Sequence, residues 1–379
     1  MSNPNLHTTT ESLVKLFVLV AALVSPGAVR AATVETKPAF VEIVLTDVAP
    51  TTRATIEKWK KERFKGVAVV LDDRTGQAAC REMAEQIMQG GLDLYFWIEV
   101  GRNPKLASEH PKWMAALGTH EDWQKNFPKF PEPKVGEVAK VFPWVPIVYQ
   151  EGFNAHLARI EQMIKLAPQG WRGLLLNDLQ GGPSSCGCGN LQCRWAIDYH
   201  VHPTATKAEG EDVAARFLGE LRKRVGDKLL IPVWTTECEM ADLPAAKHQG
   251  RPGTGFCGNV GCATATCPDV FSRQFSSLAT AQDGPIGILG VHSALQRTQP
   301  EFGGGPGWFT NALEYLRVTL PAHDAKAIPV DRLWVVVEGG RSGDEAIARK
   351  LARATGAGAV IVARSRVEQS YQPRLVPTK

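Results

Sequence analysis

The sequence predicts an α/β protein built as a single (β/α)8 barrel, and two features of the chain carry this prediction. Eight short runs of β-branched or apolar residues end in polar residues, and stretches with helical periodicity lie between them, which is the pattern of βα units. The length of 379 residues, with 44% hydrophobic, suits one barrel of ordinary size once a short leader is set aside. A doubly wound parallel sheet is the alternative fold for the same pattern.

The expected strands are short and apolar, as parallel strands covered by helices are. In chain order they are FVEIVLTDV (40–48), KGVAVVLDD (65–73), DLYFWIEV (93–100), WRGLLLNDL (171–179), KLLIPVWTTE (228–237), GPIGILGVHS (284–293), RLWVVVEGG (332–340) and GAVIVARS (358–365). Helices are expected between them where apolar residues recur every three or four positions. These segments are 51–64, 75–89, 155–167, 211–225, 309–320 and 343–355.

Two connections, 101–150 and 238–283, are far longer than a βα unit needs. The first is rich in prolines and aromatic residues, and the second carries four of the eight cysteines. Loops of this length in a compact domain are usually functional or cross-linked. In a barrel they would follow the third and fifth strands, at the C-terminal face where the active sites of such barrels lie.

Residues 1–31 have the features of a secretory signal peptide. Lys15 precedes the apolar run LFVLVAALV, the helix-breaking Pro26 follows, and Val-Arg-Ala at 29–31 offers a small-residue cleavage site. The run is too short to span a bilayer, and no later stretch is apolar for long enough. We therefore expect a secreted or periplasmic protein with no membrane partner, in which residues 32–379 form one barrel domain.

The charge of the chain argues against a nucleic-acid partner. Removing residues 1–31 lowers the net charge from +4 to +3, which is too weak a bias to attract nucleic acid. The ten tryptophans suit a carbohydrate ligand as well as a core, because indole rings stack and bury a large apolar area. We expect a carbohydrate partner and no cofactor.

Seven of the eight cysteines fall in two segments that follow the fourth and fifth expected strands. They are Cys186, Cys188, Cys193, Cys238, Cys257, Cys262 and Cys267. Both segments contain Cys-Gly-Asn, in CGNLQC and CGNVGC, and Gly-Asn favours a tight turn that would bring two sulfurs together. In an exported protein the first interpretation is three disulfides and one free thiol, and the second is a thiolate site for zinc or an iron–sulfur cluster. The eighth, Cys80, is expected to be a buried apolar residue of the helix 75–89.

Polar residues at the C-terminal ends of parallel barrel strands gather around one mouth. The residues at these positions are Asp47, Asp72, Asp73, Glu99, Asn177, Asp178, Glu237, His292, Glu338 and Arg364. Carboxylates dominate this set. Hydrolysis of a glycosidic bond needs one carboxylic acid to protonate the leaving oxygen, and one carboxylate to act as nucleophile or to activate water.

The fourth and seventh strands carry a resemblance to a known group of enzymes. Asn177-Asp178 ends the fourth strand and Glu338 ends the seventh, which resembles the TIM-barrel retaining glycoside hydrolases. In that group the acid/base follows an Asn on strand four, and the nucleophile is a Glu on strand seven. The segment YFWIEVGRNPKLASEHPKWMA, residues 95–115, is similar to secreted barrel proteins related to glycosidases.

This resemblance implies a secreted carbohydrate-active hydrolase that cleaves glycosidic bonds with paired carboxylates. It implies that Asn177 contacts a sugar hydroxyl, that Asp178 is the acid/base and that Glu338 is the nucleophile. The acid that follows Asn177 is Asp where the group has Glu, so its reach is shorter.

Further residues are expected to bind the sugar at the mouth of the barrel. Trp97 and Trp234 lie near strand ends and suit either a sugar platform or the core, Glu237 and His292 lie at the ends of the fifth and sixth strands, and Trp195 would border the mouth. Two alternatives stay open. One is a non-catalytic carbohydrate-binding barrel whose acids are structural, and the other is a metal or iron–sulfur protein that uses the thiolates.

Overall fold

A computed structural model gives the arrangement of the barrel. It describes residues 40–114, 131–147, 149–177, 179, 207–237, 284–291, 329–338, 342–365 and 372–378. These residues belong to one compact unit, Ala39–Lys379. The expected signal peptide, residues 1–31, lies outside the described residues, so export and the start of the domain at residue 32 stay predictions.

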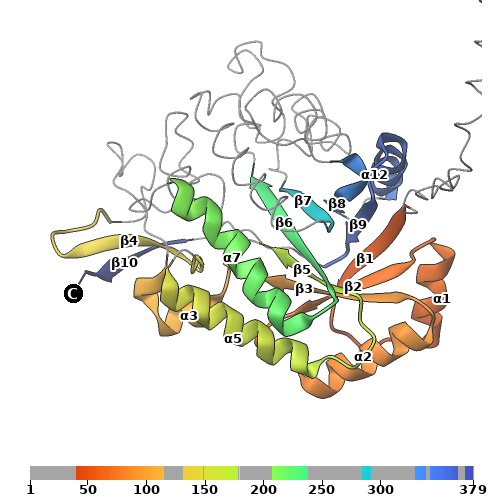
Figure 1. Cartoon of the computed structure of the whole chain (residues 1–379), viewed down its shortest axis with the longest axis horizontal. Helices are drawn as coiled ribbons and strands as arrows, with labels where there is room; N and C mark the ends of the chain where they lie inside the picture. The colour runs from red at the N-terminus through yellow and green to blue at the C-terminus, as the bar shows by residue number, and fades with distance from the viewer. Residues whose placement is uncertain are drawn as a thin grey trace, which may run out of the picture. The chain divides into compact units, whose positions relative to one another are not determined.

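Eight parallel strands form a closed barrel (Figure 1). They are β1 Val41–Asp47, β2 Gly66–Leu71, β3 Asp93–Glu99, β5 Gly173–Asn177, β6 Leu229–Glu237, β7 Ile286–Val291, β8 Leu333–Glu338 and β9 Ala359–Ala363. They pair in this order, and β9 pairs with β1 to close the barrel. Each strand lies inside one of the eight expected ranges, so the (β/α)8 barrel is confirmed. The doubly wound alternative is wrong, because an open sheet would leave its two edge strands unpaired.

Alternate residues of a strand face the barrel interior or the surrounding helices. On β1, Ile43 and Leu45 pack inside the barrel in one cluster with Trp97 of β3. Val44 between them packs outside, in the cluster that contains Ile56. The core therefore has two layers, one enclosed by the strands and one between strands and helices.

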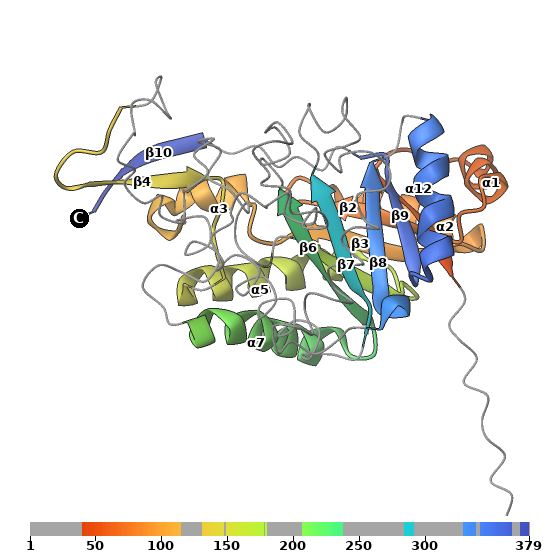
Figure 2. The same cartoon turned by 90° about the horizontal axis from the view of Figure 1, so that it is seen from above.

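Five of the six described α-helices pack against the outer side of the barrel (Figure 2). Those described are α1 Arg53–Lys61, α2 Gln77–Gln89, α3 Pro104–Glu109, α5 Gln150–Leu166, α7 Lys207–Val225 and α12 Ser342–Thr355, with single 3-10 turns at Pro111–Trp113 and Val330–Arg332. Five of the six expected helices are confirmed, and the sixth, 309–320, lies outside the described residues. The start of α1 is fixed by Thr52, whose side chain accepts a hydrogen bond from the backbone N–H of Thr55, as an N-cap does.

Two further strands, β4 Glu137–Phe142 and β10 Gln372–Pro377, form an antiparallel pair outside the barrel sheet. They lie beside α3 in both views (Figure 1, Figure 2), and Val376 of β10 packs with Ala107 of α3 and with Met114. The sequence did not predict this pair. The connection 101–150, expected as one long loop, therefore contains α3, a 3-10 turn, β4 and the start of α5.

Glu42, the second residue of β1, is a buried carboxylate with 5% exposure. Arg349 and Arg353 of α12 form ion pairs with its two oxygens, and Arg349 Nε donates to Glu42 Oε2 at 3.0 Å. Arg349 also donates to the backbone carbonyl of Glu62, directly after α1. A buried charge is costly unless it is paired, so Glu42 needs these arginines. Through its contacts with Glu42 and with the Glu62 carbonyl, Arg349 links α12 to β1 and to the end of α1.

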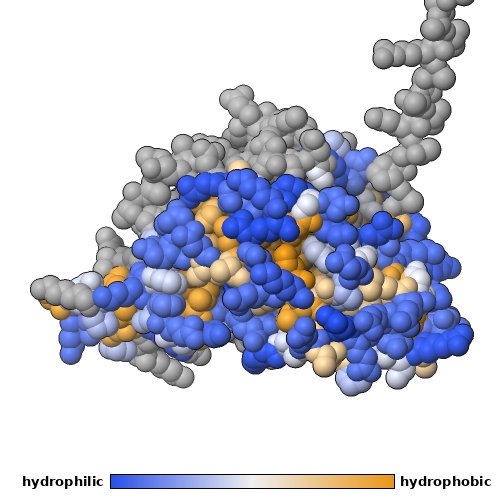
Figure 3. Space-filling model, turned by 60° about the horizontal axis from the view of Figure 1, so that its bottom comes forward, coloured by the Kyte–Doolittle hydropathy of each residue, from blue (hydrophilic) through white to orange (hydrophobic). Residues whose placement is uncertain are grey.

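The face of the molecule in Figure 3 is mostly hydrophilic, with apolar residues in narrow patches between polar ones. Val135 and Ile347 are exposed large hydrophobic side chains. None of the helices within the described ranges carries an apolar stretch long enough to cross a bilayer.

Candidate functional site

A cavity of about 390 Å³ opens at the C-terminal ends of β1, β2 and β3. This is the face of a (β/α)8 barrel that carries active sites. The polar residues that line the cavity are Asp47, Asp72, Asp73, Arg74, Glu99, Arg102, Asn103, Lys105, Arg159 and Ser365. Four carboxylates and four cationic side chains therefore surround one space of the size of a small-molecule site.

Glu99, the last residue of β3, presents a carboxylate that two neutral donors hold in place. Trp97 Nε1 donates to Oε1 at 2.7 Å, and Asn177 Nδ2 donates to Oε2 at 2.8 Å. Trp97 lies two residues before Glu99 on the same strand, so both side chains point to one side. Asn177 is the residue of β5 that pairs with Glu99 in the sheet register. Both donors are fully buried, so the orientation of this carboxylate is fixed by Trp97 on its own strand and by Asn177, which the register of β3 and β5 places beside it.

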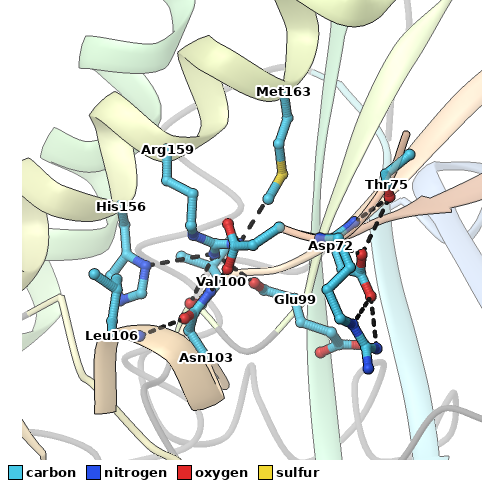
Figure 4. A network of polar contacts seen from close by, with 11 residues as sticks. Asp72, Thr75, Glu99, Val100, Asn103, Leu106, His156, Arg159 and Met163 are labelled. Atoms are coloured by element: carbon cyan, nitrogen blue, oxygen red, sulfur yellow. Dashed lines mark hydrogen bonds and ion pairs between the residues drawn. The ribbon is translucent and has the colours of Figure 1, made fainter. Parts of the chain in front are cut away.

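Arg159 of α5 reaches from the outer helix layer to the strand ends (Figure 4). Its Nη2 donates to the backbone carbonyls of Glu99 at 2.7 Å and Val100 at 3.3 Å, and its Nη1 lies 3.9 Å from Asp73 Oδ1. The side chain is only 10% exposed. Burial lowers the pKa of the guanidinium below its ordinary value, and the carboxylates of Asp73 and Glu99 oppose that shift.

Asn103 links Asp73, which follows β2, to the start of α3. Its Nδ2 donates to Asp73 Oδ2 at 2.7 Å, and its Oδ1 accepts from the backbone N–H of Leu106 at 2.8 Å. Asn before Pro104 is the sequence of an N-cap followed by a first helical proline. The cap of α3 therefore also fixes the orientation of a cavity carboxylate.

Asp72 forms a compact turn after β2. Its Oδ2 accepts from Arg74 Nη2 at 2.8 Å, and its Oδ1 accepts from the Arg74 backbone N–H at 2.8 Å and from Thr75 Oγ1 at 3.2 Å. Burial opposes ionisation of Asp72, but the hydrogen bonds from Arg74 outweigh it and hold the pKa of the carboxyl below its usual value. Asp72 is therefore a structural anion of the loop between β2 and α2.

His156 supports Arg159 from the preceding turn of α5 (Figure 4). Its ring is fully buried. Its Nε2 lies 2.7 Å from the backbone carbonyl of Val145, and its Nδ1 lies 3.4 Å from Arg159 Nη2. The first contact requires the proton on Nε2, so Nδ1 accepts from Arg159. Burial, together with the charge of Arg159, lowers the pKa of His156 to about 3, so the ring is neutral.

We expect His156 to make the protein less stable in acid. Its pKa in the unfolded chain is about 6.5, so between pH 6.5 and 3 the unfolded chain binds a proton that the folded chain excludes. This contribution to the free energy of unfolding is complete above pH 6.5 and falls by about 1.4 kcal/mol per unit as the pH drops through that window. Urea unfolding of the wild type and of His156→Gln between pH 7.5 and 4.5 measures it. The variant should show the flatter pH dependence, and equal slopes would contradict the assignment.

The structure places several of the sequence-predicted site residues at strand ends. Asn177 ends β5, the fourth barrel strand, and Glu338 ends β8, the seventh. Glu237 ends β6, and Trp234 lies within it. Trp97 lines the cavity from β3. Because the strands are parallel, all of these strands end at the same face of the barrel.

Other predicted residues lie outside the described part of the chain. They are Asp178, Trp195, His292, Cys186, Cys188, Cys193, Cys238, Cys257, Cys262 and Cys267. Their catalytic, binding, disulfide or metal roles stay predictions. Cys80 is a buried free cysteine in α2, as expected. Within the described ranges, no group of three or more His, Cys, Asp or Glu side chains is arranged to hold a metal ion.

Sequence reasoning did not assign Arg159 or Asn103 to the site. Asn103-Pro104 carries a local signal for a helix start, but nothing in the sequence says which carboxylate the Asn amide meets. Arg159 carries no signal, because a cationic residue in a helix usually faces solvent. Its direction follows from the packing of α5 on the barrel.

Comparisons with known proteins assign neither a family nor a function to the chain. No family model and no curated protein matches the chain. The glycoside hydrolase domain of PgaB (BpsB) from Bordetella bronchiseptica aligns with a TM-score of 0.47 and 11% identity, covering 86% of this chain and 94% of that one. A β-galactosidase from Rahnella sp. R3 aligns with a TM-score of 0.48 and 11% identity, covering 89% and 52%.

An old yellow enzyme homologue from Zymomonas mobilis aligns in a similar way, with a TM-score of 0.43 and 10% identity over 86% of this chain and 84% of that one. This chain spans about half the length of the galactosidase. With TM-scores below 0.5 and identities near 10%, these likenesses carry no argument about function. The closed sheet of eight parallel strands itself defines the chain as a (β/α)8 barrel protein, with a charged cavity at its C-terminal face.

Proposed function

We propose that the protein is a carbohydrate-active hydrolase that cleaves glycosidic bonds with paired carboxylates. Asp178 is the general acid/base in this proposal, and Glu338 is the nucleophile or the base that activates water. The observation that carries it is the position of Asn177 and Glu338 at the ends of the fourth and seventh barrel strands. Parallel strands bring residues at these two positions to one mouth.

The described cavity supports a hydroxyl-rich ligand. A sugar presents hydroxyls that donate and accept hydrogen bonds, and charged groups form the stronger of such bonds. The cavity walls offer carboxylates as acceptors and arginine and lysine side chains as donors. Trp195, Trp234, Glu237 and His292 complete the sugar site in this proposal.

The stereochemical outcome depends on how far apart the two acids lie. Carboxyl groups about 5 to 5.5 Å apart fit a retaining mechanism with a covalent intermediate, and a separation of about 6.5 to 9.5 Å leaves room for the water of an inverting one. A crystal structure that resolves Asp178 and Glu338 gives this distance. Acids at opposite ends of the barrel would rule the hydrolase out.

Export and cross-linking belong to the same proposal. The signal peptide directs the chain to the periplasm or the cell exterior, where disulfides persist. Six of the seven cysteines that follow β5 and β6 then form three disulfides that brace the loops at the mouth, and the seventh is a free thiol. A thiolate metal site is the alternative for these residues.

Release of reducing ends from cellulose, xylan, mannan, galactan, starch and chitin tests the function. We expect the purified protein to cleave at least one of these and Glu338→Gln to lose cleavage while keeping its fold. Glu57→Gln is the matched control, because Glu57 is an exposed residue of α1 that forms a surface ion pair with Lys60. Binding of a glycan by the wild type without cleavage would favour the non-catalytic carbohydrate-binding barrel. A wild-type protein that neither binds nor cleaves any of these glycans would contradict both the hydrolase and the carbohydrate-binding barrel.

A further inference from the structure

We propose that Glu99 is a substrate-contacting residue that accepts hydrogen bonds from the hydroxyls of a saccharide unit in the cavity. In this assignment, Trp97 and Asn177 are positioning residues that act through Glu99. The inference rests on the proposed function, since it names a further contact of the same carbohydrate site. It departs from the sequence-based expectation that Asn177 itself touches the sugar.

Glu99 differs from the other carboxylates that line the cavity in what holds it. Asp72 pairs with the cation Arg74, and Asp73 is held by Asn103 and lies near Arg159. The two oxygens of Glu99 each accept from a neutral, buried donor. A carboxylate oxygen has about two lone-pair sites, so each oxygen retains a site for a ligand.

The surroundings of Glu99 suit a hydroxyl donor. The residue is half-buried and lines the cavity, so a ligand in that space reaches a fixed, charged acceptor. Hydrogen bonds to an ionised acceptor are about twice as strong as neutral ones. Two oxygens with fixed directions match two neighbouring hydroxyls of one sugar ring better than a single donor.

Arg159 gives a second, independent sign that the cavity takes a ligand. Its side chain is nine-tenths buried and lines the cavity, yet its Nε has no hydrogen-bond partner among the described residues. Buried polar groups in folded proteins nearly always have a partner, and an unpaired one calls for a water or a ligand. One of the residues that line the cavity with Glu99 therefore carries a buried donor without a partner among the described residues.

The positioning role of Asn177 follows from its burial. The side chain is fully buried and its Nδ2 donates to Glu99 Oε2, so the amide influences the cavity through that carboxylate. Trp97 is in the same position, because its ring is fully buried and its N–H is donated to Glu99 Oε1. Both residues fix where the Glu99 oxygens point.

Isothermal titration with cellohexaose, xylohexaose, mannohexaose and chitohexaose tests the contact, together with steady-state kinetics on the hexaose that the wild type cleaves. We expect Glu99→Gln to raise Kd and KM about 10- to 100-fold, the effect of losing a hydrogen bond to a charged group. The kcat should change little, because the contact is the same before and during reaction. Glu57→Gln should behave as the wild type does.

A double-mutant cycle separates contact from positioning. Asn177→Ala should weaken hexaose binding in the wild-type background. It should have almost no further effect in the Glu99→Gln background, because both changes act on the same carboxylate contact with the sugar. Independent, additive effects would show that Asn177 has a contact of its own and would overturn its positioning role. Glu99→Asp keeps the charge, and should bind the hexaose better than Glu99→Gln.

Each result counts for or against the proposal. Wild-type affinity in Glu99→Gln overturns the contact while leaving the hydrolase intact. If Glu99→Gln fails to fold, Glu99→Asp decides, and unchanged Kd in that shortened variant overturns the contact. If the wild type neither binds nor cleaves any hexaose, the proposed function itself has failed, and the role of Glu99 falls with it.

Discussion

Replacing Asp178 with Asn is expected to lower kcat on a cleaved glycan by two to four orders of magnitude, the usual contribution of a positioned general acid/base (about 10²- to 10⁴-fold). The change removes the proton donor and almost no volume, so the fold should survive. Asp178 follows Asn177, the last residue of the fourth barrel strand, and the proposal makes it the general acid/base. Its loss should therefore lower kcat. The measurement is release of reducing ends under saturating substrate, with thermal melting as the test of folding.

Asp93→Asn is the matched control for that variant. Asp93 begins β3, at the opposite end of the barrel from the mouth, and pairs with Arg172 at 2.9 Å. The same substitution there should leave kcat unchanged. An unchanged kcat in a folded Asp178→Asn protein would remove Asp178 from the mechanism and direct attention to the carboxylates of the described cavity.

Replacing Arg349 with Met should lower the free energy of unfolding by about 3 to 5 kcal/mol, because it leaves the buried Glu42 carboxylate without its principal partner. Arg349 contacts Glu42 through two nitrogens and also donates to the Glu62 carbonyl. Urea unfolding at pH 7 measures the loss. Glu42 lies at the N-terminal end of β1, at the opposite end of the barrel from the mouth. The activity of the protein that remains folded should therefore not change.

Two further variants make this result interpretable. Arg353→Met removes the other partner of Glu42. The Arg353 side chain is 57% exposed, so solvent should make the loss of stability in this variant much smaller than in Arg349→Met. The double variant Glu42→Leu with Arg349→Met removes the unpaired charge and should recover much of the loss. A double variant no more stable than Arg349→Met alone would contradict the explanation by a buried charge.

The barrel strands could be predicted from the sequence because each one is a local signal. A buried parallel strand such as VEIVLTD or GVAVVL is a short apolar run that ends on an aspartate or meets one, and such a run is visible without knowledge of its neighbours. Pairing between distant segments is not a local signal. The sequence EVAKVF of β4 lies in a proline-rich connection, and its partner QPRLVP of β10 carries two prolines, which argue against a strand.

The candidate site was predictable in part for the same reason. Strand-end positions identify Glu99 and Asn177 as residues of the mouth, because parallel strands share a direction. The sequence leaves Trp97 between a sugar platform and the core, and only the structure shows that its N–H is donated to Glu99, two residues further along β3. The direction of the Arg159 side chain depends on how α5 packs on the barrel, and the spacing of residues within the helix does not predict that packing.

The closure of the barrel has a consequence for how the chain acquires its fold. The first strand, β1, pairs on one side with β9 near the end of the chain, and the hydrogen bond from Ser365 to Asp47 spans 318 residues. During synthesis, β1 therefore keeps an open edge until β9 has left the ribosome, and open edges invite pairing with other chains. A nascent chain that still lacks β9 cannot close the barrel, so it could pass through a translocation channel without first being unfolded.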